Sequence, residues 1–82
     1  MVEAGDGVAD AADRVVAAAT VRAALQRLGD DHRRILELAY DRGLSQREIA
    51  HALALPLGTV KSRTYYALRA FRLACEELGV KP

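Results

Sequence analysis

Positive charge, hydroxyl groups and tyrosine rings are concentrated in one stretch of the sequence, residues 42–72. This stretch holds six Lys and Arg residues and a single acid, Glu48, so its net charge is +5. Lys and Arg bind phosphates and guanine edges, hydroxyl groups hydrogen-bond to phosphates or bases, and a tyrosine ring packs against a thymine methyl group. Residues 1–13, in contrast, hold four acids and no base. The distribution indicates a polyanionic partner, although charge alone is equally consistent with a solvated surface that binds nothing.

The sequence lacks the residue combinations that catalysis or metal binding requires. It contains no pairing of a nucleophile with a base and no glycine-rich phosphate loop. His32, His51 and Cys75 do not make a zinc cluster, and a single cysteine cannot form an internal disulfide. Cys75 lies in an apolar helical stripe, which favours a buried thiol over a reactive one. We therefore expect no enzymatic activity, no cofactor and no metal site.

The length and the distribution of apolar residues limit the class of protein. A chain of 82 residues makes one small domain with a compact core. The first residues contain no basic stretch followed by an apolar one, so a signal peptide is not expected. No apolar run approaches the ~18 residues needed to span a bilayer. We expect a soluble, cytoplasmic protein with no membrane contact.

A long helix is predicted at the end of the chain, over residues 57–78, between Pro56 and Gly79. Two starts stay open, because Pro56 fits the first helical position while Thr59 could cap the helix with its side chain. At 100° per residue, one face is a continuous apolar stripe. The stripe consists of Val60, Thr64, Ala67, Phe71, Ala74 and Leu78. This stripe is predicted to face the core.

The opposite face of this helix is predicted to meet solvent or a ligand. It holds Gly58, Ser62, Tyr65, Arg69 and Glu76, with Lys61, Tyr66 and Arg72 on its flanks. Before Glu76 it carries no acid, whereas a generic solvated helix face mixes both signs. Gly58 lacks a β-carbon, so a phosphate could approach the start of the helix, where free N–H groups favour anions.

A short helix over residues 46–53 is predicted just before the long one. Ser45 and Glu48 have the spacing of a capping box, and Leu44 and Ile49 that of a hydrophobic staple. The short helix must end before Pro56, because proline cannot lie inside it. A short helix followed within a few residues by a long one is the layout of a helix-turn-helix.

Two further helices are predicted upstream, over residues 8–28 and 31–42. The first is rich in alanine, the best helix former, and is ended by Gly29. Asp30 is expected to cap the second, which stops near Gly43. Residues 1–7, with two glycines and two acids, are expected to be a disordered linker remnant, and residues 8–82 the folded domain. The predicted fold is therefore all-α, a four-helix domain with a helix-turn-helix.

Two features of the long helix allow more than one interpretation. Arg63 lies about 60° from Val60, at the edge of the stripe. A structural role, bridging to an acid such as Glu37, is favoured over a base contact. Tyr66, Ala70 and Leu73 form a second apolar strip, either packed against the first helix or exposed as a docking surface for another protein.

The run LSQREIAHALALPLGTVKSR, residues 44–63, resembles region 4, the C-terminal DNA-binding domain of bacterial sigma factors of the extracytoplasmic-function (ECF) group. The motif at 58–63, G-T-V-K-S-R, is the most specific part. The motif at 48–50, E-I-A, is shared with other helix-turn-helix regulators. The likeness covers residues 21–78. Gly29 departs from a proline that is usual in the family, Ala54 from a frequent glycine in the turn, and Tyr66 from a common arginine.

The resemblance implies a role in transcription initiation, with the last helix in the major groove of the −35 promoter element. It implies base or phosphate contacts from Lys61, Ser62, Tyr65 and Tyr66, and backbone contacts from Gln46 and Arg47. Thr59 and Arg69 complete the predicted DNA-binding set. The resemblance also implies docking on the β-flap of core RNA polymerase, inhibition by an anti-sigma factor, and a further domain that lies outside this chain. The strip of Tyr66, Ala70 and Leu73 is the predicted surface for a protein partner, and the domain alone is expected to be monomeric.

Two other functions stay open. A LuxR-type response-regulator output domain has a similar frame and would dimerise on palindromic half-sites. Such domains usually carry a Thr-His pair where this chain has Ser62-Arg63. A protein-interaction module with an incidental basic face would bind DNA without sequence preference, and salt would abolish that binding uniformly.

Overall fold

Residues 3–79 fold into four α-helices and one π-helical turn. The computed structural model describes the backbone of residues 3–79 and the side chains of residues 14–79. The elements are α1 (Glu3–Gln26), α2 (Asp30–Leu36), the π-helical turn η1 (Glu37–Asp41), α3 (Gln46–Leu53) and α4 (Leu57–Glu77). Residues 3–79 form no strand. The predicted all-α fold with a helix-turn-helix, made here by α3 and α4, is confirmed.

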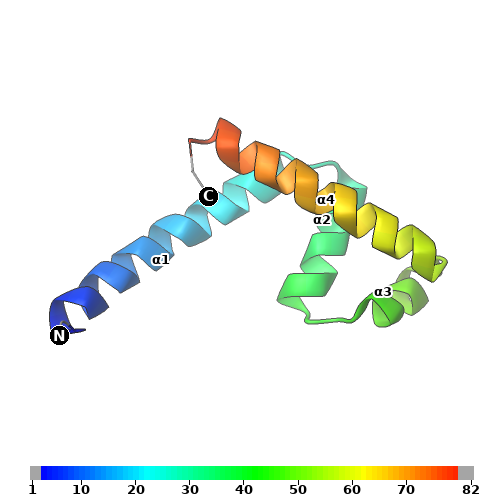
Figure 1. Cartoon of the computed structure of the whole chain (residues 1–82), viewed down its shortest axis with the longest axis horizontal. Helices are drawn as coiled ribbons and strands as arrows, with labels where there is room; N and C mark the ends of the chain where they lie inside the picture. Colours follow the sequence, from blue (N-terminus) through cyan, green and yellow to red (C-terminus); the bar gives the residue numbers. More distant parts are fainter. Residues whose placement is uncertain (1–2, 80–82) are drawn as a thin grey trace.

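The helices are arranged around α4, which packs against each of α1, α2 and α3 (Figure 1). α3 lies beneath the beginning of α4, and the end of α1 lies beneath its final turns. The N-terminal part of α1 extends away from the other helices, so the molecule is elongated, with extents of 48 × 25 × 16 Å. α4 is therefore the helix against which the other three α-helices pack.

Two clusters of buried apolar side chains hold α4 in place. Ile35, Ile49 and Val60 form the first cluster, joining α2, α3 and α4. Leu28, Leu36 and Ala67 form the second, which joins the end of α1 to α2 and α4. The apolar stripe of α4 is confirmed as core: Val60, Thr64, Ala67 and Ala74 are buried, and Phe71 and Leu78 are half-buried. Because this stripe is fixed inward, the opposite face of α4 must point outward.

The first helix is longer than predicted at its N-terminus. α1 begins at Glu3 instead of Val8, so residues 3–7, which were expected to be disordered, are helical. Met1 and Val2 lie outside the described residues. Gly5 and Gly7 each lower helix propensity by about 1 kcal/mol relative to alanine, but neither forbids a helix. α1 ends at Gln26, two residues before the predicted end.

The second helix differs from the prediction at both ends. Its N-cap is Gly29, not Asp30, and no side chain caps it. Asp30 and Asp31 instead lie in the first turn, where negative charge interacts favourably with the helix dipole. The α-helix ends at Leu36 and the chain continues as η1, so the regular helix expected up to residue 42 is interrupted. η1 ends at Asp41, close to Gly43, where the helix was predicted to stop and where a φ of 68° suits glycine.

α4 begins at Leu57, as the predicted range 57–78 has it, although neither Pro56 nor Thr59 has the role proposed for it. Pro56 is the N-cap, one position before the helix, and Thr59 is the third residue inside it. No side chain caps this end. The Thr59 N–H donates to Pro56 O at 3.0 Å, so the N–H groups left without an intrahelical acceptor are those of Leu57 and Gly58. A β-carbon added to Gly58 would meet no atom within 4 Å. The beginning of α4 is consequently open to an approaching anion.

The capping box of α3 is confirmed. The Glu48 N–H donates to Ser45 Oγ at 3.1 Å, and the Ser45 N–H donates to Glu48 Oε1 at 2.8 Å. Leu44 packs in the same apolar cluster as the buried Ile49, as the staple requires. These contacts fix the first turn of the helix-turn-helix.

Ser45→Ala and Glu48→Ala are each expected to lower the free energy of unfolding by about 0.5–2 kcal/mol, because each removes one partner of the box. Thermal unfolding followed by circular dichroism measures the effect. Glu48→Gln is the matched control, since glutamine keeps the acceptor and should retain most of the stability. Unchanged midpoints for both alanine variants would show that the box does not stabilise α3.

Ala54, in the turn between α3 and α4, has a left-handed backbone conformation, with φ 55° and ψ 46°. The turn is closed by hydrogen bonds from Ala54 N to His51 O at 3.2 Å and from Leu55 N to Ala50 O at 2.9 Å. A residue with a β-carbon is strained here by roughly 1–2 kcal/mol. The family's frequent glycine at this turn avoids that strain.

Ala54→Gly is therefore expected to raise the free energy of unfolding by about 0.5–1 kcal/mol, the relief of strain exceeding the added flexibility of the unfolded chain. Ala52→Gly, at an exposed position inside α3, is the control and should lower stability by about 1 kcal/mol. Chemical denaturation of both variants measures the two changes in the free energy of unfolding, which should have opposite signs. A loss of stability in Ala54→Gly would contradict the assignment of strain to this turn.

Candidate nucleic-acid interface

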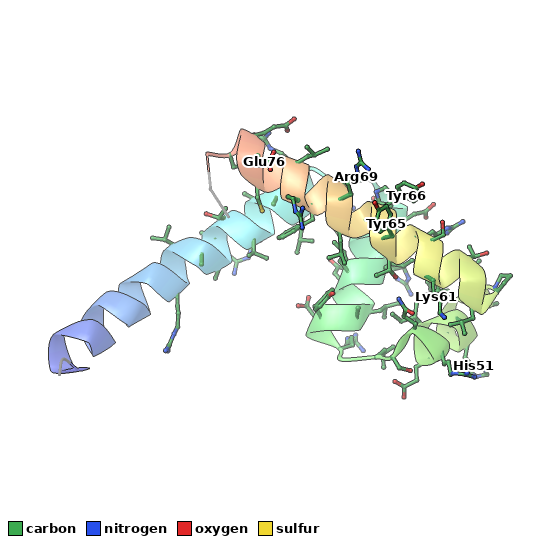
Figure 2. The ribbon with its side chains drawn as sticks, in the orientation of Figure 1. His51, Lys61, Tyr65, Tyr66, Arg69 and Glu76 are labelled. Atoms are coloured by element: carbon green, nitrogen blue, oxygen red, sulfur yellow. The ribbon has the colours of Figure 1, made fainter. Side chains whose placement is uncertain are left out.

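The outer face of α4 is exposed as predicted. Lys61, Ser62, Tyr65, Tyr66 and Arg69 all lie on the solvent side of the helix. In Figure 2, the labelled side chains of Lys61, Tyr65, Tyr66 and Arg69 follow α4 from its start toward its middle. Thr59, the remaining predicted contact on this helix, is half-buried. The structure thus brings five of the six predicted α4 residues together on one accessible surface.

This surface is positively charged over most of its length. Lys61, Arg69 and Arg72 are exposed, and none of them is in an ion pair with any residue among 14–79. Glu76 is the first acid on α4 and lies near its far end (Figure 2). Cations that are not neutralised by neighbouring acids are free to contact phosphates.

The first turn of α3 supplies the other two predicted contacts. Arg47 is exposed and Gln46 is half-buried. His51, which is not among the predicted contacts, is also exposed, in the last turn of α3 near the start of α4 (Figure 2). It lies four residues after Arg47, and residues at this spacing share a helix face. That spacing was the signal that could have identified it.

Arg63 has the structural role that the sequence favoured, but with another partner. Its side chain is half-buried, and its guanidinium lies 3.9 Å from Asp31 Oδ2, not beside Glu37. A second pair, Arg27 to Glu77 at 3.2 Å, links the end of α1 to the last turn of α4. Both pairs are largely exposed, so each contributes at most about 1 kcal/mol. They orient α4 more than they stabilise it.

The strip of Tyr66, Ala70 and Leu73 is only partly packed. Ala70 contacts the cluster of Leu28, Leu36 and Ala67. Tyr66 and Leu73 are 55% and 53% exposed, so the alternative that they pack in the core is wrong. Two large apolar side chains therefore flank the outer face of α4 in contact with solvent.

An apolar groove of about 170 Å³ lies between α1, η1 and α4. Its lining is mainly apolar, with two acids: Val21, Leu25, Leu36, Tyr40, Leu68 and Phe71, together with Glu37 and Asp41. Tyr40, on the π-helical turn, is 67% exposed. The sequence did not predict this groove. Leu68 lines this groove and also lies beside Tyr65 and Arg69, so the groove borders the outer face of α4.

The remaining chemistry is limited. Within residues 14–79, no three His, Cys, Asp or Glu side chains are grouped so that they could hold a metal ion. Cys75 is half-buried, less enclosed than the core position expected for it. None of the described helices has the length and apolar character needed to cross a membrane.

Comparison with known proteins agrees with this geometry. Residues 24–73 match the family model described as "Sigma-70, region 4". Over 75 residues, or 92% of this chain, 45% are identical to the "ECF RNA polymerase sigma factor SigL" of Mycobacterium tuberculosis, of which they cover 40%. Over 69 residues, or 84% of this chain, 42% are identical to the "ECF RNA polymerase sigma factor SigK" of Mycobacterium bovis, of which they cover 37%. This chain thus spans about two fifths of the length of these relatives. The resemblance to region 4 of ECF sigma factors is confirmed, and the chain belongs to the Sigma-70, region 4 family.

Proposed function

We propose that this domain binds the −35 element of promoter DNA as the C-terminal part of an ECF sigma factor and so takes part in transcription initiation. The observation that carries the proposal is the outer face of α4, where exposed Lys61, Ser62, Tyr65 and Arg69 form an acid-free surface. α4 would enter the major groove, and Gln46 and Arg47 at the start of α3 would contact the backbone. The function is non-enzymatic and belongs to the bacterial cytoplasm.

A second surface suits docking on core RNA polymerase. The groove between α1, η1 and α4 is apolar, and the exposed Tyr40 at its edge is of a residue type that often anchors protein interfaces. Because most of the groove is lined by residues of α1, α2 and η1, the β-flap could occupy it from that side while the outer face of α4 stays on DNA. An anti-sigma factor would inhibit the domain by covering this groove, or Tyr66 and Leu73 beside the basic face.

Selection from random DNA tests the function. The domain is joined to the N-terminal domain of an ECF sigma factor and offered random duplexes in the presence of core polymerase. Enrichment of one asymmetric motif is the expected result. Palindromic half-sites bound by a dimer would favour the response-regulator alternative. DNA binding without any enriched motif would favour the protein-interaction alternative.

Arg47→Glu is expected to weaken binding to all duplexes to the same degree, because a backbone contact carries no base information. The slope of log affinity against log salt should become shallower by about 1. Titrations of the selected motif and of point variants of it measure both effects. A change in the preferred sequence would instead place Arg47 among the residues that contact bases.

A further inference from the structure

Tyr65 and Tyr66 form an ordered aromatic pair on the outer face of α4. Their ring centroids are 5.1 Å apart and the ring planes meet at 85°, an edge-to-face arrangement. The side chains are 59% and 55% exposed, so the core does not hold either ring. The contact between the two rings therefore helps to restrict their orientation.

The two tyrosines have different positions around α4. Tyr65 follows Lys61 and Ser62 by four and three residues, so it lies one turn further along the same face. Tyr66 lies about 100° away, on the flank that also carries Ala70 and Leu73. A duplex held by Lys61 and Ser62 would meet the ring of Tyr65 first, while Tyr66 would support that ring from the side.

An exposed aromatic ring complements one chemical group in the major groove. Thymine is the only standard base with a methyl group there, and apolar side chains recognise that group by contact. Lys61 and Ser62 can hydrogen-bond to phosphates or base edges, but neither provides an apolar plane. The ring of Tyr65 supplies what these two residues lack.

We propose that Tyr65 recognises the 5-methyl group of a pyrimidine in the promoter, and that Tyr66 is a positioning residue that holds the Tyr65 ring at the angle this contact needs. The proposal depends on the proposed function, since it places α4 in the major groove. It adds the chemical group that is recognised and a coupling between two residues. It also gives a role to Tyr66, where the family commonly has arginine.

Replacement of thymine by uracil tests the proposal, because uracil pairs identically and lacks only the methyl group. The selected duplex, labelled with a fluorophore, is titrated with the 82-residue chain at low salt, each thymine being replaced in turn. Wild-type protein should bind about fourfold more weakly when one particular thymine is replaced, the effect of one buried methyl group. A 5-methylcytosine at that position should bind more tightly than cytosine, which separates the methyl group from the rest of the base.

Variants of the two tyrosines separate contact from positioning. Tyr65→Ala should remove the difference in affinity between the thymine and uracil duplexes. Tyr65→Phe should keep this difference, because the ring makes the contact. Tyr66→Ala should reduce the difference although Tyr65 is present, and Tyr66→Phe should restore it. Arg69→Ala is the control and should weaken binding to thymine and uracil duplexes equally.

The outcomes distinguish this proposal from the proposed function. Equal affinity of the wild-type chain for every thymine and uracil duplex, with binding of the motif intact, would overturn the methyl contact alone. A full thymine preference in Tyr66→Ala would overturn the positioning role. Failure of the wild-type chain to prefer the selected motif at all would overturn the proposed function, and the methyl contact with it.

Discussion

Lys61→Ala is expected to weaken binding to the selected promoter motif by roughly 1–3 kcal/mol, a loss of about fivefold to more than a hundredfold. Lys61 is exposed on the outer face of α4, one residue after the fully buried Val60, which fixes its direction. Its ammonium group is in no ion pair with any residue among 14–79. Removing it costs the folded domain little, so the loss should fall on the complex.

The matched control is Arg14→Ala, which removes the same charge from an exposed position on the projecting part of α1. It should leave promoter affinity nearly unchanged. Titration of both variants at one salt concentration, together with their thermal midpoints, measures the contrast. Equal losses in the two variants would mean that net charge acts, and not a local contact. Early melting of Lys61→Ala would mean that the orientation assigned to α4 is wrong.

The parts of the fold that follow from neighbouring residues were predictable. The bounds of α3 were correct because Ser45, Glu48 and Pro56 specify its ends locally. The inward stripe of α4 was correct because a helix repeats every 3.6 residues whatever packs against it. The outer face is the opposite side of the same helix. The sequence was therefore enough to predict that Lys61, Ser62 and Tyr65 are exposed.

Features that depend on a few tenths of a kcal/mol or on tertiary contacts were not predictable. The π-helical turn at Glu37–Asp41 shifts the hydrogen bonds of one turn and leaves no distinct pattern in composition. Glycine and aspartate are both favourable N-cap residues, so the sequence could not decide whether Gly29 or Asp30 caps α2. Arg63 pairs with Asp31 and not with Glu37. This choice depends on the angle at which α2 crosses α4, which the local sequence does not specify.

The candidate site shows the same division. Exposure of the α4 residues follows from periodicity, but the groove lined by Val21, Tyr40 and Leu68 requires three elements to be placed together. The edge-to-face contact of Tyr65 and Tyr66 depends on side-chain torsions that no spacing specifies. Sequence therefore located the exposed basic face of α4, and the structure added the groove and the arrangement of the rings.

The affinity of this domain alone for DNA is expected to be weak and to fall steeply with salt. Only about four to six charge contacts with a duplex are available to α3 and α4, fewer than a stable complex normally uses. Counterion release gives a slope near −0.9 per neutralised phosphate, so affinity should drop by about 10²–10³ between 50 and 200 mM salt. Titrations across this range, with sedimentation to measure the mass of the complex, check the slope and the expected monomer. Nanomolar binding at ~150 mM salt, or a stoichiometric dimer on DNA, would contradict the expectation.

Attachment to polymerase should supply the affinity that the domain lacks. If the β-flap occupies the groove between α1, η1 and α4, α4 meets the promoter at an effective concentration that can reach the millimolar range. Core polymerase with the joined protein of the selection experiment should then hold the motif at ~150 mM salt. Tyr40→Ala separates the two contributions, because Tyr40 lines the groove from η1 and belongs to neither of the helices expected to meet DNA. At low salt this variant should bind DNA with the affinity of the wild-type protein. It should lose much of the increase in promoter affinity that core polymerase provides. An undiminished gain would mean that polymerase holds the domain through another surface, of which Tyr66 and Leu73 are the exposed candidates.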